Sequence, residues 1–393
     1  MSKAIQNDDH EFIANTYTRF NLCIKSGNGA VCIGSDDREY IDFTSGIGVN
    51  ALGYCDSGWV NAICTQAATL SHTSNSYYSE PCVKLAKALC EKSGFKKVFF
   101  ANSGAEANEG AIKAARKYSH DKYGDDRNEI ITLYNSFHGR TITTLSATGQ
   151  DSFHTSFAPF TKGFVYADAN SLASLQNAVS NKTCAIMLEM IQGEGGVVPL
   201  EKSYVQAAAK LCNEKDILLI VDEVQTGIGR TGSFFCCEQF DIKPDIVTAA
   251  KGLGGGLPIG AVLFGQKTAN VLSAGTHGST FGGNPIASAG ASYVLSCLTP
   301  SLMQAVSAKG ELIKKRLAKM KGINGVTGMG LMLGVDIAPL NARDIAEKCM
   351  ANGLLVLTAK TRLRFLPPLT ITEEQLEKGL SILESTLQKE INA

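Results

Sequence analysis

The chain has 393 residues, 44% of them hydrophobic and 19% charged, and its 37 basic residues balance 37 acidic ones. This composition is typical of a globular protein, and the length predicts two domains. A neutral chain without a basic stripe gives no reason to expect nucleic acid or a membrane surface as a partner.

Cysteine and histidine usage argues against a disulfide scaffold and against a metal site. The twelve cysteines are spread over the chain without a C-x-x-C spacing, and the six histidines form no H-x-x-x-H motif. We therefore expect reduced thiols and no metal. The first residues, MSKAIQNDDHEF, lack the apolar core of a signal peptide, and no apolar run approaches the ~20 residues of a membrane span, so a cytoplasmic location is expected.

The predicted elements begin with two short strands within residues 30–43, joined by a turn at Asp36 and Asp37, and continue with a helix over 58–70. The middle of the chain alternates strands and helices, with strands predicted at 97–101, 130–134, 185–190, 217–222 and 245–249 and helices at 105–118 and 204–214. This α/β alternation predicts a mainly parallel central sheet flanked by helices on both faces.

The last hundred residues show a different pattern. We expect a long helix over 290–319, strands near 325–337, a helix over 342–351, strands near 354–366 and a final helix from Glu373. This order predicts a smaller α+β domain formed by residues 289–393, to which residues 1–58 contribute, beside a large domain of residues 59–288.

A single lysine, Lys251, stands between an apolar strand and a glycine-rich loop in VTAAKGLGGGLPIGA, residues 247–261. Partial desolvation there would lower its pKa and free its amine as a nucleophile; the alternative is an exposed lysine beside a flexible turn. The dinucleotide fingerprint G-x-G-x-x-G is absent, because Leu257 or Ile259 occupies the place of its last glycine.

A second apolar strand ends in a carboxylate, Asp222, in ILLIVDEVQTGIGRTG, residues 217–232. The end of such a strand lies at the ligand-binding edge of an open α/β sheet, although Asp222 could also cap the next helix. A carboxylate for a pyridine nitrogen and a lysine for an aldehyde are the two groups that pyridoxal-phosphate (PLP) chemistry most needs.

Two further segments supply groups for a phosphate and for a planar ring. In residues 99–118, Ser103 precedes an alanine-rich helix whose free N–H groups could bind phosphate, or Ser103 is simply a helix cap. The segment 134–149 carries Phe137, His138 and Arg140, where an aromatic face could stack on a ring and a guanidinium could hold a carboxylate.

These four segments, in their order along the chain, resemble the class III, ornithine-type PLP aminotransferases of fold type I. Six further segments extend the resemblance over nearly the whole chain: FTSGIGVNALGY, LSHTSNSYY, MIQGEGGV, THGSTFGGNP, GMGLMLGVDI and RFLPPL. It implies a homodimeric enzyme in which residues 59–288 bind PLP.

The resemblance also implies a role for each cofactor residue. Lys251 binds the cofactor covalently and moves the substrate proton, and Asp222 keeps the pyridine nitrogen protonated. Phe137 stacks on the ring, Gln225 contacts the phenolic oxygen, and Thr280 reaches the phosphate across the dimer interface. The remaining implied cofactor contacts are Ser103, Gly104, Ala105, Glu223 and Val224.

The implied reaction moves the terminal amino group of N2-acetylornithine to 2-oxoglutarate, a step of arginine biosynthesis. Arg140, with Ser279, would bind the carboxylate far from the reacting nitrogen, and Arg364 the α-carboxylate of glutamate. Glu194 would pair with Arg364 while acetylornithine is bound, since a buried unpaired charge is costly. The simpler interpretation makes Glu194 a solvated loop residue and Arg364 a surface residue.

Two stretches depart from the family pattern and leave the donor open. Residues 52–57 read LGYCDS where relatives commonly have L-G-H-x-H-P, and residues 188–190 read LEM where they have L-E-P. Alternatives are an aminotransferase for ornithine, succinyldiaminopimelate or 4-aminobutyrate, a PLP aminomutase, and a non-catalytic PLP-binding regulator. A nicotinamide dehydrogenase is disfavoured by the missing fingerprint.

Overall fold

A seven-stranded sheet forms the centre of the computed structural model, which describes residues 2–392. Strands β11, β10, β7, β5 and β6 are mutually parallel neighbours, while β12 runs antiparallel to both β11 and β4. The mainly parallel sheet is therefore confirmed. In spatial order the strands are β4 (Lys97–Ala101), β12 (Gly260–Phe264), β11 (Ile246–Ala249), β10 (Leu218–Asp222), β7 (Thr183–Leu188), β5 (Glu129–Leu133) and β6 (Phe164–Ala167).

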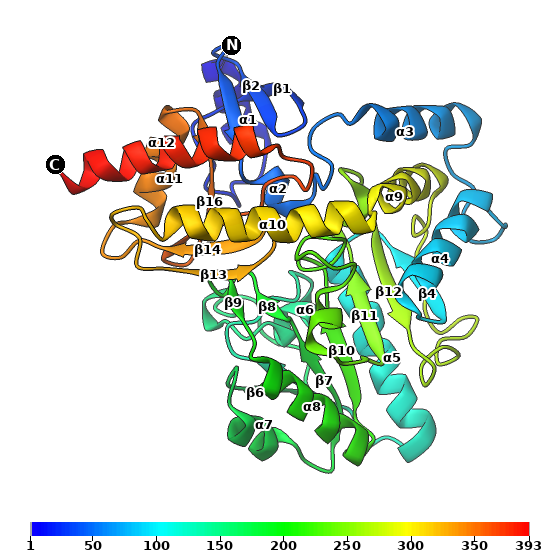
Figure 1. Ribbon diagram of the computed structural model, residues 1–393. Coiled ribbons are helices and arrows are strands. Elements are labelled where there is room, and N and C mark those ends of the chain that lie inside the picture. The colour runs from blue at the N-terminus through cyan, green and yellow to red at the C-terminus, as the bar shows by residue number, and fades with distance from the viewer. Residues whose placement is uncertain (1, 393) are drawn as a thin grey trace.

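Helices cover both faces of this sheet (Figure 1). Leu218 and Ile220 of β10 pack in one cluster with the alanines of α5 (Gly104–Tyr123). Leu219 and Val221 pack in a second cluster, which includes buried residues of α8 (Lys202–Lys215). Because both faces of the strands are buried, they are continuous apolar runs and not alternating ones.

The carboxyl-terminal part forms a separate four-stranded antiparallel sheet with the order β13, β14, β17 and β16. Helices α10 and α11 pack on it, and α12 packs on both of these helices (Figure 1). The bounds are α10 (Pro300–Leu317), β13 (Gly325–Met329), β14 (Met332–Asp336), α11 (Ala342–Ala351), β16 (Leu357–Ala359), β17 (Arg362–Phe365) and α12 (Glu373–Ile391).

The amino-terminal strands join this carboxyl-terminal part. β3 (Glu39–Asp42) pairs in parallel with β15 (Leu354–Leu355). β15 is thus the fourth strand of a sheet whose other three, β1 (Ile24–Asn28), β2 (Val31–Gly34) and β3, are antiparallel neighbours. The remaining elements are α1 (Ser2–Phe12), α2 (Ser45–Gly48), α3 (Ser57–Thr69), α4 (Glu80–Ser93), α6 (Ile142–Ala147), α7 (Leu172–Ala178), β8 (Ile191–Gln192), β9 (Val198–Pro199), α9 (Pro285–Cys297) and short 3₁₀ helices at Asp151–Phe153, Cys236–Phe240 and Lys251–Gly254.

The single long helix predicted over 290–319 is wrong, because α9 and α10 are two helices bent by 74°. Thr299 caps α10 by accepting a hydrogen bond from the backbone N–H of Leu302, and Pro300 occupies its first turn. Both are helix-start signals that the apolar pattern running through them concealed. No single helix within residues 2–392 is long and apolar enough to cross a membrane; α9 and α10 meet that length and composition only as a bent pair.

Candidate active site

The carboxyl ends of β4, β5, β10 and β11 meet at one edge of the large sheet, where they surround a cavity of about 430 Å³. Loops that follow these strands carry the predicted site residues, as expected for a parallel α/β sheet. Of those residues, the ones that line the cavity are Ser103, Gly104, Ala105, Phe137, Arg140, Asp222, Val224, Gln225 and Lys251.

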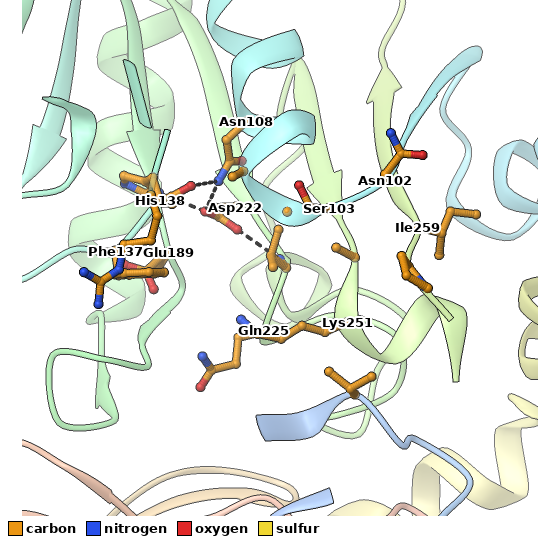
Figure 2. A pocket seen from close by; sticks show the side chains of 18 of the residues that line it. Asn102, Ser103, Asn108, Phe137, His138, Glu189, Asp222, Gln225, Lys251 and Ile259 are labelled. Carbon is orange, nitrogen blue, oxygen red and sulfur yellow. Dashed lines mark hydrogen bonds and ion pairs between the residues drawn. The ribbon is translucent and has the colours of Figure 1, made fainter. Parts of the chain in front are cut away.

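Asp222 ends β10, and three neighbours hold its carboxylate. The side-chain amide of Asn108 and Nδ1 of His138 both donate to Oδ2, each at 2.8 Å, and the backbone N–H of Val224 donates to Oδ1 at 3.0 Å. The first two bonds are drawn in Figure 2. These donors fix the orientation of the carboxylate at the cavity wall.

His138 is buried, and its protonation follows from Asp222. Burial disfavours the imidazolium, but the hydrogen bond and charge of Asp222, together with the charge of Glu189, outweigh it and raise the pKa of His138 above its usual value. Nε2 of His138 has no hydrogen-bond partner within the described part of the chain. His138 is therefore a buried group that holds a proton against the carboxylate of Asp222.

Lys251 follows β11 with a left-handed backbone, at a φ of 42°. A non-glycine residue in this region is strained, and such strain is concentrated at functional sites. Burial lowers the pKa of Lys251, although the charges of Asp222 and Glu194 partly oppose this. Its amine is thus more available as a nucleophile and a base than that of an exposed lysine.

The amino terminus of α5 forms another part of the cavity wall. The Ser103 hydroxyl accepts a hydrogen bond from the N–H of Glu106 at 3.2 Å, which leaves the N–H groups of Gly104 and Ala105 at the positive end of a 20-residue helix. A Cβ atom on Gly104 would lie 2.6 Å from the side chain of Val224, so a larger residue there would have to displace Val224. This wall suits a phosphate group.

Glu194 and Arg364 form an ion pair beside the cavity. Arg364 lies on β17, almost fully buried, and Nη1 also lies 3.5 Å from Oε1 of Gln225. Its Nε has no hydrogen-bond partner among residues 2–392. Burial favours the neutral form of Glu194, but the charge and hydrogen bond of Arg364 outweigh it and lower the pKa of Glu194.

Besides Glu194 and Arg364, three further predicted site residues do not line this cavity. The carboxylate of Glu223 points into the core, where Thr226 and the N–H of Cys237 donate to it, and burial raises its pKa to about 7. The Ser279 hydroxyl accepts from Asn102 at 3.2 Å, beside the start of α5. Thr280 lines a different hollow, which also includes Tyr77 and Tyr78.

Four polar residues that line the cavity had no predicted role: Asn102, Asn108, His138 and Glu189. Asn108 stands on the buried face of α5 among alanines at helical spacing, which is the signal that could have identified it. Glu189 follows the buried strand β7, and it accepts from the N–H groups of Phe137 at 2.9 Å and Gly193 at 3.4 Å. Burial raises the pKa of Glu189.

The donor set fits pyridoxal 5'-phosphate. A strained, partly desolvated lysine, an oriented carboxylate and the open amino terminus of a long helix line one cavity, with the ring of Phe137 beside them. These are the groups needed for an aldehyde, a pyridine nitrogen, a phosphate and a ring face. No cluster of His, Cys, Asp or Glu that could hold a metal ion occurs among the described residues.

Comparison with known proteins agrees with this chemistry. The family model for class-III aminotransferases matches residues 12–387. An acetylornithine aminotransferase from Haemophilus ducreyi is 53% identical over 390 residues, 99% of each chain, and one from Methanocaldococcus jannaschii is 45% identical over 374 residues, 94% of each.

Solved structures give the same result. An ornithine aminotransferase from Toxoplasma gondii, whose structure has partial occupancy of PLP at the active site, has a TM-score of 0.95 at 31% identity, covering 100% of this chain and 96% of that one. An N-acetylornithine aminotransferase from Stenotrophomonas maltophilia has a TM-score of 0.85 at 37% identity, covering 98% and 99%. The chain is a PLP-dependent enzyme that belongs to the class-III aminotransferases.

Proposed function

We propose that this enzyme transfers the terminal amino group of N2-acetylornithine to 2-oxoglutarate, giving N-acetylglutamate 5-semialdehyde and glutamate, as a cytoplasmic step of arginine biosynthesis. The two half-reactions alternate at one site in a ping-pong cycle. The observation that carries the proposal is the unequal state of two arginines: Arg140 lines the cavity without an ionic partner among the described residues, whereas Arg364 is paired with Glu194. Relatives named for acetylornithine at up to 53% identity support the donor.

The cofactor residues act through position and charge. Bound PLP supplies an electron sink for the substrate carbon that loses its proton. Asp222, held by Asn108 and His138, keeps a negative charge where the ring nitrogen is to be protonated. Nζ of Lys251 would accept the proton that the substrate carbon loses. The N–H groups of Gly104 and Ala105 hold the phosphate.

The two arginines let one cavity accept two unlike amino donors. Arg140 binds the carboxylate distant from the reacting nitrogen, which both N2-acetylornithine and glutamate carry. Glutamate has a second carboxylate beside its reacting nitrogen, and Arg364 binds that group once Glu194 moves away. While acetylornithine is bound, Glu194 keeps the buried Arg364 neutralised, which avoids an uncompensated charge.

We further propose that the working unit is a homodimer. Thr280 lies in a hollow outside the cavity of its own chain, next to Tyr77 and Tyr78, whose rings are exposed. Phe281 is exposed as well. A second copy over this surface would cover the aromatic side chains and bring Thr280 to the partner's phosphate site, so an active monomer would contradict this part of the proposal.

A single half-reaction tests the donor. The purified enzyme is saturated with PLP, N2-acetylornithine is added without 2-oxoglutarate, and the visible absorption of the bound cofactor is followed. Rapid bleaching that 2-oxoglutarate reverses is the expected result. If the absorption persists with N2-acetylornithine but is bleached by ornithine, succinyldiaminopimelate or 4-aminobutyrate, that compound is the donor instead. Turnover without consumption of 2-oxoglutarate would indicate an aminomutase.

A further inference from the structure

Arg140 differs from Arg364, which lies beside the cavity and is paired with Glu194, because its guanidinium contacts two aromatic rings and no carboxylate among the described residues. Its Cζ lies 4.1 Å from the ring centroid of Phe153 and 5.6 Å from that of Phe137. It makes no hydrogen bond or ion pair with any residue in 2–392, and it is exposed at the cavity. All of its N–H donors are therefore free for a ligand.

Phe153 is placed beside Arg140 by its own short helix. It ends the 3₁₀ helix Asp151–Phe153, and its ring packs edge-on against Phe137, with centroids 5.9 Å apart. Just before that helix, Gln150 donates from its side-chain amide to the carbonyl of Ser136 at 2.9 Å. The backbone that carries Phe153 is thus attached to the loop that carries Arg140.

The stacking has a direct consequence for carboxylate binding. An arginine side chain loses considerable rotamer freedom when it binds a ligand, unless it is already held in the right orientation. Phe153, whose ring centroid lies 4.1 Å from Cζ, restricts the positions that the guanidinium can take, while the N–H groups of Arg140, which make no hydrogen bond within residues 2–392, stay open to a carboxylate.

We propose that Phe153, which does not itself line the cavity, is a positioning residue that holds Arg140 ready for the distal carboxylate of the substrates. This inference rests on the proposed function, in which Arg140 binds that carboxylate. It implies that Phe153 contributes to the preference for carboxylate-bearing donors over otherwise identical amines, without taking part in the proton transfer.

A matched pair of amino donors isolates this effect. N-acetylputrescine is N2-acetylornithine without its carboxylate, so the acetamide, the chain and the reacting amine are the same. Phe153→Leu should raise KM for N2-acetylornithine and for 2-oxoglutarate by about three- to thirtyfold, the range of a partly desolvated cation–π contact, with kcat within about twofold. Its kcat/KM for N-acetylputrescine should stay at the wild-type value.

Two further variants serve as controls. Phe153→Tyr keeps the ring and should behave like the wild type. Phe157→Leu removes an exposed phenylalanine of the same segment that has no ring contact with Arg140, and it should change neither KM. If Phe153→Leu does not fold, as judged by its melting temperature, Phe153→Met replaces it as the variant without an aromatic ring.

The failure of this inference is distinguishable from failure of the proposed function. Arg140→Lys should lose the preference for N2-acetylornithine over N-acetylputrescine, because an ammonium lacks the planar fork. If it keeps that preference, the substrate role of Arg140 is wrong. The role given to Phe153 is overturned by a different result, in which Arg140→Lys loses the preference for N2-acetylornithine but the variants without a ring at position 153 keep that preference. It is also overturned if those variants lose activity equally towards N2-acetylornithine and N-acetylputrescine.

Discussion

Glu194 and Arg364 are joined across two distant segments of the chain, the loop after β8 and strand β17, and the pair buries an arginine at the edge of the catalytic cavity. Because Arg364 lowers the pKa of Glu194, the carboxylate stays ionised throughout the neutral range. The pair stabilises the fold above the usual pKa of a glutamate, and this contribution is lost only as the pH falls through the lowered value. Protonation of Glu194 therefore does not separate the pair at neutral pH.

The first prediction concerns the two half-reactions. Arg364→Ala should lower kcat/KM for glutamate by at least about thirtyfold, because a buried charge partner of the α-carboxylate is lost, and should affect N2-acetylornithine much less. Glu194→Ala should lower kcat/KM for N2-acetylornithine more than kcat/KM for glutamate, because Arg364 is then unpaired while acetylornithine is bound. Stopped-flow measurement of each half-reaction with each variant decides this, and equal losses in both would contradict the exchange of partners.

The second prediction concerns Lys251. Lys251→Ala should reduce kcat by about 10²–10⁴-fold or more, because the group that moves the substrate proton is removed. PLP should still bind, since Asp222 and the start of α5 are unchanged, and equilibrium dialysis measures this. Lys243→Ala, which removes an exposed lysine nearby in sequence, is the control and should retain full activity. Substantial turnover by Lys251→Ala would exclude the mechanism.

The sequence predicted the elements whose pattern is local. The strand at 97–101, the helix at 342–351 and the start of the last helix at Glu373 agree with the structure to the residue. Strand β12 was missed because Gly260–Phe264 continues a glycine-rich loop, and the helix break at Thr299 lay inside a continuous apolar pattern. The division into domains at residues 58 and 288 stays a prediction.

For the site, the sequence identified the residues at the strand ends but not the contacts between them. That Asp222 and Lys251 line one cavity follows from the adjacency of β10 and β11. The bonds from Asn108 and His138 to Asp222 join residues far apart in the sequence, on α5, the loop after β5 and β10, and no local pattern encodes such a meeting. The inward position of Glu223 likewise depends on Thr226 and Cys237.

The third prediction concerns the pH dependence set by His138. Since Asp222 raises the pKa of His138 above its ordinary value of 6.5, the protonated histidine stabilises the fold fully below about pH 6.5, and this contribution declines as the pH rises through the raised pKa. His138→Phe should remove this contribution. The free energy of unfolding of the variant should therefore fall below that of the wild type by more at pH 6 than at pH 9. Urea unfolding of cofactor-free protein measures this difference. His10→Gln, at an exposed histidine, should show no such trend.

The fourth prediction concerns Arg230, a buried cation without a carboxylate within ion-pair distance in the described residues. Nη1 donates to the carbonyls of Leu331, at 3.1 Å, and Pro367, and burial lowers the pKa of the guanidinium to about 9. Arg230→Met would fill the volume and remove the buried charge, but both carbonyls would remain buried without this donor.

We therefore expect Arg230→Met to lower the free energy of unfolding by about 1–3 kcal/mol, the usual result of leaving buried acceptors unsatisfied. Arg38→Met removes an exposed arginine that also donates to a carbonyl, that of Ala351, and should change stability by no more than about 0.5 kcal/mol. Chemical denaturation of both variants compares them directly. A stability of Arg230→Met equal to or above that of the wild type would mean that desolvation of the guanidinium outweighs the hydrogen bonds it makes.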